Sequence, residues 1–195
     1  MEKINSLKTN NTYSNFTDEE LVAEIVLTKN TGLFSVLYDR YSKTVYNKCL
    51  SFVKDDNEAQ DLTQDIFLKL FIKLPTFNGK SKFFTWLYSF TYNFCVNYVT
   101  RDVHKKIEKQ SISIDERDNL LIEIDDYSLF QLRVDNLQKA LEMIAPEDKM
   151  LLLLKYQDAI SIKELSKVLD IGESAVKMRL KRAKARIIKK YNEIL

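Results

Sequence analysis

Residues 161–190 read SIKELSKVLDIGESAVKMRLKRAKARIIKK, and this stretch decides the fold. It opens with a capping box, because the Ser161 hydroxyl can accept the backbone N–H of Glu164 while the Glu164 carboxylate reaches back to Ser161. A short connection at residues 170–173 follows, and then a second helical pattern begins. Its apolar stripe consists of Val176, Leu180, Ala183 and Ile187. Two short helices joined by a tight turn, the second exposed and basic, predict a DNA-binding helix-turn-helix.

The face of the second helix opposite this stripe is expected to be exposed. On a 3.6-residue wheel it consists of Ser174, Met178, Lys181 and Ala185, flanked by Lys177 and Arg182. Between residues 174 and 190 there are eight Lys and Arg and no acid, which suits the phosphates of duplex DNA. The alternative is a solvated face with favourable charge at a helix C-terminus. That alternative explains Lys184 to Lys190 well and the cations of the first turns less well.

Helical periodicity also runs through the N-terminal half of the chain. Residues 17–20 (TDEE) form another capping box, and residues 55–58 (DDNE) suit a helix start. Apolar residues then recur at helical spacing over residues 34–46, 59–71 and 82–104. Because the whole chain has only 3 Gly and 2 Pro, we expect an all-α protein with short connections.

The segment between the two helical regions has a different composition. Residues 111–130 hold six acids against Arg117 alone, a net charge of −5, and this predicts an inter-domain linker. We therefore expect a mobile tail at 1–16, an N-terminal helical domain at 17–107, an acidic linker at 108–131 and a C-terminal helix-turn-helix domain at 132–195. The acidity of the linker suggests the hypothesis that it mimics nucleic acid in a basic channel of a partner.

Several classes of protein are not expected from this sequence. Cys49, Cys95 and the single histidine, His104, have no zinc-site spacing. The two cysteines are expected to be small buried hydrophobes, although a disulfide stays open. No glycine-rich phosphate loop or Ser/His/Asp set is found, so we expect no enzyme, no cofactor and no metal. With no signal peptide and no membrane-length apolar run, a cytoplasmic protein is expected.

Two helix faces in the N-terminal half are ambiguous. The helix from residue 55 to 71 has an outer face that suits either a partner groove or solvent, and periodicity alone favours solvent. The next helix carries eight aromatic residues between residues 83 and 98. Trp86 and Phe90 are expected in the core, whereas Tyr88 and Tyr92 lie off the core stripe. For these two tyrosines, core packing and stacking on unpaired bases both remain open.

Taken together, these strings resemble the extracytoplasmic-function group of bacterial RNA-polymerase sigma factors. Residues 57–71 (NEAQDLTQDIFLKLF) look like the polymerase-binding helix of that family. Residues 77–79 (FNG), followed by 84–88 (FTWLY) and Asn93, look like its promoter-melting segment. Residues 160–166 (ISIKELS) and 175–183 (AVKMRLKRA) look like its reader of the upstream promoter element. The likeness covers about residues 18–106 and 132–191.

This resemblance implies a role for individual residues. The clamp coiled coil of the polymerase's largest subunit would contact Asp61, Gln64, Asp65 and Leu68. The −10 promoter element, with one base flipped into a pocket, would contact Phe77, Asn78, Gly79, Lys80, Ser81, Asn93, Asn97 and Arg101. The −35 element would contact Ser174, Lys177, Met178, Arg179, Lys181 and Arg182, with Arg179 nearer phosphate. The flap region of the polymerase and an anti-sigma factor are the other partners that the resemblance implies.

The chain also departs from the family pattern at four positions. Asp170 stands where Gly is frequent, Gly172 where a Ser cap is common, Met178 where Ser is frequent, and Tyr92 where a small or basic residue is common. These departures affect the expected promoter sequence and not the class. The alternative function is a free-standing regulator that binds an operator without polymerase. That class usually needs a dimerisation surface, and no heptad seam is found.

Overall fold

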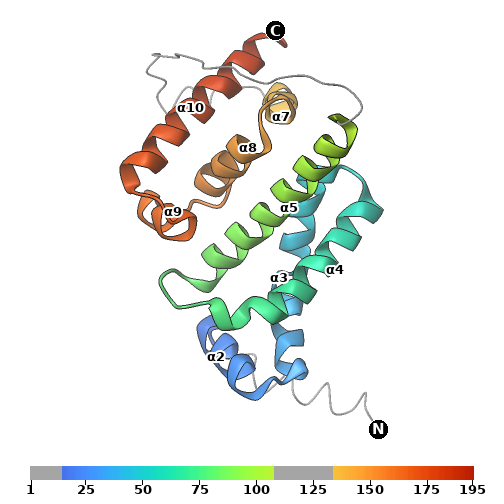
Figure 1. Ribbon diagram of the computed structural model, residues 1–195, viewed down its shortest axis with the longest axis vertical. Helices are drawn as coiled ribbons and strands as arrows, with labels where there is room; N and C mark the ends of the chain where they lie inside the picture. The colour runs from blue at the N-terminus through green and yellow to red at the C-terminus, as the bar shows by residue number, and fades with distance from the viewer. Residues whose placement is uncertain (1–14, 108–133) are drawn as a thin grey trace. The chain divides into compact units, whose positions relative to one another are not determined.

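The structure is a computed structural model that describes residues 15–107 and 134–195 (Figure 1). The side chains of residues 102–107, including His104, lie outside the description, as do the predicted linker and the tail up to residue 14. Every regular element in the described ranges is a helix, which confirms the all-α prediction. The chain forms two compact units, and the division falls within one long helix, between Cys95 and Val96.

In residues 15–95, the part of the first unit that the structure describes, the elements are four helices and a short 3₁₀ turn. Their bounds are α2 (Asp18–Thr28), α3 (Thr31–Val53), α4 (Asp56–Lys73), η1 (Leu74–Thr76) and the first half of α5 (Phe83–Ile107). α3 packs against both α2 and α4, and α2 also contacts η1. Buried aliphatic residues recur at helical spacing along these elements and fill the space between them, among them Leu21, Ile25, Leu37, Leu62, Ile66 and Leu87.

Local hydrogen bonds set where the helices of this unit begin. In the predicted capping box, the Glu20 N–H donates to Thr17 Oγ1 over 3.2 Å, and the Thr17 N–H donates to the Glu20 carboxylate over 2.8 Å. The Asp55 carboxylate accepts the Glu58 N–H at 2.9 Å and caps α4. Both helix starts were predicted from sequence and are confirmed.

The interior of the first unit contains a buried lysine beside two tyrosines. Lys48 is 4% exposed, and its Nζ lies 4.1 Å from the centroid of the Tyr88 ring. The same ammonium donates a hydrogen bond of 3.1 Å to the Tyr92 hydroxyl. Tyr92 is only 1% exposed, so the suggestion that it stacks on unpaired bases is wrong. Lys48 supplies a partner for its hydroxyl inside the core, which the helical wheel does not show.

Cys49 on α3 and Cys95 on α5 are both fully buried. They are free thiols, and their Sγ atoms lie 3.9 Å apart. The hydrogen bond with Cys95 lowers the pKa of Cys49 from its usual value. The prediction of small buried hydrophobes is confirmed, and the structure adds that the two thiols touch each other.

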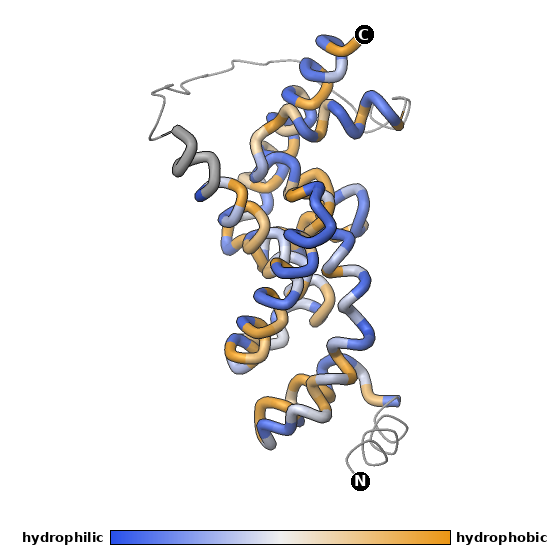
Figure 2. The backbone as a smooth tube through the Cα atoms, turned by 90° about the vertical axis from the view of Figure 1, so that its right-hand side faces the viewer, coloured by the Kyte–Doolittle hydropathy of each residue, from blue (hydrophilic) through white to orange (hydrophobic). Residues whose placement is uncertain are grey.

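Beyond the second half of α5, the described residues of the second unit form four helices and one π-helical turn. Their bounds are α7 (Val134–Met143), α8 (Pro146–Leu152), η2 (Leu153–Gln157), α9 (Ile162–Leu169) and α10 (Glu173–Asn192). α10 packs against α7, α8 and α9. Hydrophilic and hydrophobic residues alternate along the helices of both units, as expected for amphipathic helices that each bury one side (Figure 2).

The turn between α9 and α10 has the predicted geometry. The Ser161–Glu164 capping box is present, with the Glu164 N–H 3.2 Å from Ser161 Oγ. Asp170 ends α9 in the left-handed conformation, with φ 52° and ψ 44°. Asp adopts this conformation more readily than most residues do, although less freely than glycine. Gly172 is the N-cap of α10 and provides no side-chain hydrogen bond.

Candidate nucleic-acid and partner interfaces

The first turns of α10 present an exposed basic face. Five of the six residues predicted to contact the −35 element are exposed, and the sixth, Lys181, is half-buried. Met178 is 51% exposed, which is unusual for a methionine and leaves an apolar atom group available at the surface. The exposed five are Ser174, Lys177, Met178, Arg179 and Arg182. A helix of this kind fits the major groove of B-form DNA.

The cations of α10 fall into two groups by their partners. Near the C-terminal end, Arg186 Nη1 forms an ion pair of 2.6 Å with Asp148 on α8, and Lys190 Nζ lies 2.8 Å from Glu193. In the first turns, four cations have no hydrogen-bond or ion-pair partner within residues 15–107 and 134–195. They are Lys177, Arg179, Lys181 and Arg182. Unpaired cations on one helical face leave their charge available to an anionic ligand.

One residue of the expected outer face of α10 is buried. Ala185 is 3% exposed, so the expectation that it is exposed is wrong, although it does lie opposite the buried stripe on the helical wheel. The reason is that α10 packs against three helices at once. These helices bury more of its surface than the single apolar stripe that a helical wheel predicts. The exposed basic face therefore ends at Arg182.

In the loop between η1 and α5, residues 77–82, the first residue packs against α5 and the middle residues are exposed. The Phe77 ring lies edge-on to Phe83, with centroids 5.6 Å apart, and is tilted against Trp86 at the same distance. Asn78 Oδ1 accepts the Lys80 N–H at 3.2 Å. Between them, Gly79 adopts φ 69° with open space where a Cβ would lie. The predicted residues 78–80 are exposed, and Phe77 and Ser81 are half-buried.

The predicted −10 residues of α5 lie on later turns of that helix. Asn93, Asn97 and Arg101 follow one another at intervals of four residues, so they share one helical face, and all three are exposed. The amide of Asn93 lies 3.5 Å from Ser89 Oγ. Asn93 is ten residues beyond Phe83, about 15 Å along the helix axis. The loop does not end at this distance from Asn93, because the Phe77 ring lies against Trp86, within the first turn of α5.

The outer face of α4 carries the predicted polymerase-binding residues. Asp61, Gln64, Asp65 and Leu68 are all exposed, and their spacing places them on one side of the helix. Leu68 is 67% exposed. Neither carboxylate has an ion-pair partner in the described part of the chain. Two like charges one turn apart repel each other, so a cationic partner would relieve this repulsion.

Beside this face the structure shows a groove that the sequence did not reveal. The groove, about 730 Å³ in volume, lies between α3 and α4 and is lined by Thr31, Phe34, Tyr38, Gln64, Phe67, Leu68, Phe71 and Ile72. Ile72 is 73% exposed and one turn beyond Leu68. The sequence does contain one signal for this groove, namely two apolar residues at positions i and i+4 that lie outside the core stripe of α4. Gln64 and Leu68 belong both to the groove and to the predicted polymerase-binding face.

No group of His, Cys, Asp and Glu among the described residues is arranged to hold a metal ion. None of their helices combines the length and the apolarity needed to cross a lipid bilayer.

Comparison with known proteins identifies the family of two segments of the chain. Residues 37–104 match the family model for sigma-70 region 2, and residues 135–187 match that for sigma-70, region 4. The ECF RNA polymerase sigma factor SigX of Bacillus subtilis is 26% identical over 168 residues, 83% of this chain and 84% of that protein. The ECF RNA polymerase sigma-E factor of Escherichia coli K12 is 27% identical over 186 residues, 92% and 96% of the two chains.

Solved structures show the same fold. CnrH in complex with the cytosolic domain of CnrY superposes with a TM-score of 0.58 at 18% identity, covering 89% of this chain and 96% of that one. The sigma factor RpoE in complex with the anti-sigma factor NepR, from Bartonella quintana, gives a TM-score of 0.56 at 19% identity, covering 82% and 96%.

An all-helical chain with a helix-turn-helix unit and both sigma-70 regions in order is a transcription initiation factor that directs RNA polymerase to promoters. The chain belongs to the sigma-70 family, in its extracytoplasmic-function group.

Proposed function

We propose that the first unit binds core RNA polymerase and opens the −10 element, while the second unit reads the −35 element. The observation that carries this assignment is the division of charge on α10. Its four cations without protein partners lie in the first turns, where the second helix of a helix-turn-helix meets base edges and phosphates. The cations that serve the fold itself lie near the other end.

Base selection on the −35 element falls to the residues closest to the middle of this face. Lys177, Lys181 and Arg182 supply donors for base edges or phosphates, and Met178 offers an apolar surface that suits a thymine methyl group. Arg179 is assigned to phosphate. Base contacts choose the sequence, whereas phosphate contacts fix the register of the helix on the duplex.

The −10 element is assigned to the loop 77–82 and the exposed face of α5. Residues 78–80 are exposed around a glycine in the left-handed conformation, so this part of the loop is accessible to an extruded base. Flipping a base costs a few kcal/mol of stacking, and ring packing and edge hydrogen bonds in the loop offset that cost. Asn93, Asn97 and Arg101 then follow the strand along α5.

Polymerase binding is assigned to α4. The carboxylates Asp61 and Asp65 suit a basic coiled coil such as the clamp of the largest subunit, because opposite charges steer association and fix register. Leu68 and the groove between α3 and α4 add an apolar contact. We assign the same apolar surface to an anti-sigma factor, which would compete with polymerase for it, and the second unit to the flap region. The chain has no catalytic role of its own and works in the cytoplasm beside the polymerase.

The test is in-vitro transcription with bacterial core polymerase on a library of promoter fragments, with and without this protein. The expected result is run-off RNA only when both proteins are present, from fragments that share two short elements. Asn78→Ala and Lys80→Ala should then lower opening without changing duplex retention. No added initiation, together with tight sequence-specific duplex binding by the protein alone, would instead support a free-standing regulator.

A further inference from the structure

The helix α5 begins without a capping side chain from its own sequence. The Lys82 carbonyl accepts the Trp86 N–H at 3.2 Å, so Lys82 is the N-cap of α5, and its side chain has no acceptor. Ser81 does not substitute, because its hydroxyl donates to the Lys82 carbonyl at 3.3 Å. The first amides of a helix need acceptors from elsewhere.

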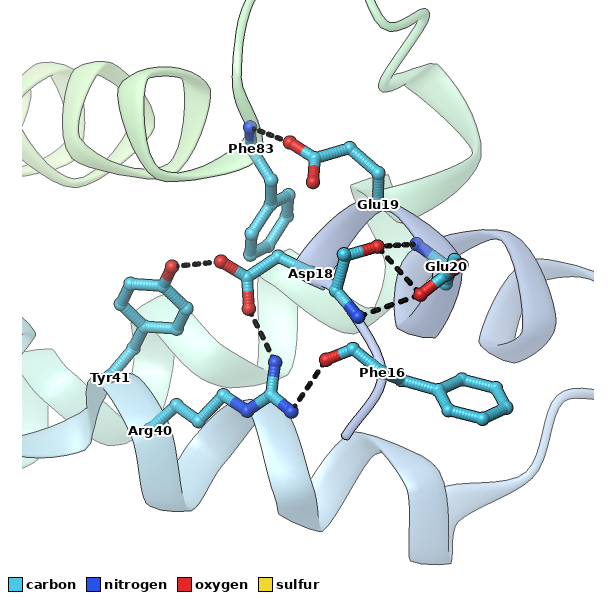
Figure 3. Close-up of polar contacts among 8 residues, drawn as sticks. Phe16, Asp18, Glu19, Glu20, Arg40, Tyr41 and Phe83 are labelled. Atoms are coloured by element: carbon cyan, nitrogen blue, oxygen red, sulfur yellow. Dashed lines mark hydrogen bonds and ion pairs between the residues drawn. The ribbon is translucent and has the colours of Figure 1, made fainter. Parts of the chain in front are cut away.

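The acceptor comes from α2, far away in the sequence. Glu19 Oε1 accepts the backbone N–H of Phe83 at 2.9 Å across 64 residues (Figure 3). Phe83 is the first residue of α5 and directly follows the loop 77–82. A carboxylate at this place also complements the positive end of the helix dipole. One exposed side chain of α2 thus fixes the point where the loop ends and α5 begins.

The first turn of α2, where Glu19 lies, is bonded to α3 through Asp18, the neighbour of Glu19. Asp18 accepts hydrogen bonds from Tyr41 and, at 2.8 Å, from Arg40 Nη1. Arg40 Nη2 also donates to the Phe16 carbonyl at 2.8 Å, and Figure 3 shows these contacts side by side. The Tyr41 ring in turn lies edge-on to Phe83, with centroids 5.9 Å apart. The first turn of α2, the middle of α3 and the start of α5 are therefore tied together by polar and ring contacts.

We propose that Glu19 is a positioning residue for promoter opening: by capping α5 from α2, it holds the loop 77–82 in the conformation that receives the −10 base. The proposal rests on the assignment of the loop to the −10 element. Glu19 contacts no DNA in this scheme. Its loss frees the Phe83 amide, lets the first turn of α5 fray, and divides the loop among several conformations.

The experiment uses the full chain with core polymerase on a promoter selected by the wild-type protein. Glu19→Ala is expected to lower the rate of promoter opening and the hydrogen-exchange protection of the Phe83 amide, each about fivefold, the size expected for loss of a cap. Glu19→Gln keeps an oxygen acceptor and should recover most of both. Glu19→Asp is one methylene shorter and should resemble Glu19→Ala.

The matched control is Glu20→Ala. Glu20 belongs to the capping box of α2 and makes no contact with Phe83, so this variant weakens α2 without freeing the start of α5. If Glu20→Ala lowers opening as much as Glu19→Ala, the role of Glu19 is only to stabilise α2 and the proposal is overturned. Equal opening by Glu19→Gln and Glu19→Asp would overturn it too. If Asn78→Ala and Lys80→Ala leave opening unchanged, the −10 assignment itself fails, which is a separate result.

Discussion

Replacing Arg179 with Ala should reduce the salt dependence of promoter binding by a defined amount. Arg179 is exposed and has no partner in the described part of the chain, and we assign it to a phosphate. One phosphate contact on B-form DNA contributes about 0.9 to the slope of log affinity against log salt concentration. When the salt concentration rises from 50 to 200 mM, the factor by which affinity falls should therefore be about 3.5 times smaller for the variant than for the wild type.

The assay is equilibrium binding of the holoenzyme, full chain plus core polymerase, to a fluorescent promoter duplex at four or more salt concentrations. Lys190→Ala is the matched control, because Lys190 lies on the same helix but is paired with Glu193 at 2.8 Å. Its slope should equal that of the wild type. The reasoning is refuted if Lys190→Ala changes the slope as much as Arg179→Ala, or if Arg179→Ala leaves the slope unchanged.

Three other perturbations have defined outcomes. Asp65→Lys should weaken binding of core polymerase about tenfold or more at low salt, measured by competition, whereas the same charge change at exposed Asp135 of α7 should have little effect. Gly79→Ala should lower the free energy of unfolding by about 1 kcal/mol, because φ is 69° at this position and only glycine adopts it freely. Gly79→Asn should lower it by less. A denaturant titration measures both. Burial, and the hydrogen bond to Asp18, raise the pKa of Tyr41 above its usual value. As the pH rises through about 10, the unfolded chain loses this proton before the folded chain does, so the stability of the fold decreases there. Tyr41→Phe should lose less stability at alkaline pH. An identical dependence of stability on pH in both proteins would contradict this.

The features that could be predicted from sequence are those encoded within a few residues. The capping boxes at Thr17 and Ser161 need only residues i and i+3, and both are present. The left-handed Asp170 follows from the tolerance of Asp for that conformation. The exposure of Asp61, Gln64, Asp65 and Leu68 follows from helical periodicity, because the core stripe of α4 determines which side remains outside.

The features that were missed depend on elements far apart in the chain. Ala185 is buried because three helices surround α10, and a wheel of one helix contains no neighbours. For Tyr92 the sequence left core packing and base stacking both open, and the structure decides for core packing, beside a lysine 44 residues earlier that donates to its hydroxyl. The contact between Glu19 and Phe83 joins positions whose spacing carries no periodic signal, and it becomes visible only once α2 and α5 are placed side by side.

The buried thiols of Cys49 and Cys95, which touch each other, can be used to measure how often the first unit opens transiently. The chain has no other cysteine, and neither thiol is reachable from water. A thiol reagent can therefore react only during excursions that separate α3 from α5. When reclosing is fast, the labelling rate equals the intrinsic thiol rate multiplied by the fraction of open molecules. Labelling kinetics on the unmodified chain would thus measure how a bound polymerase or promoter restrains this unit, without any introduced probe.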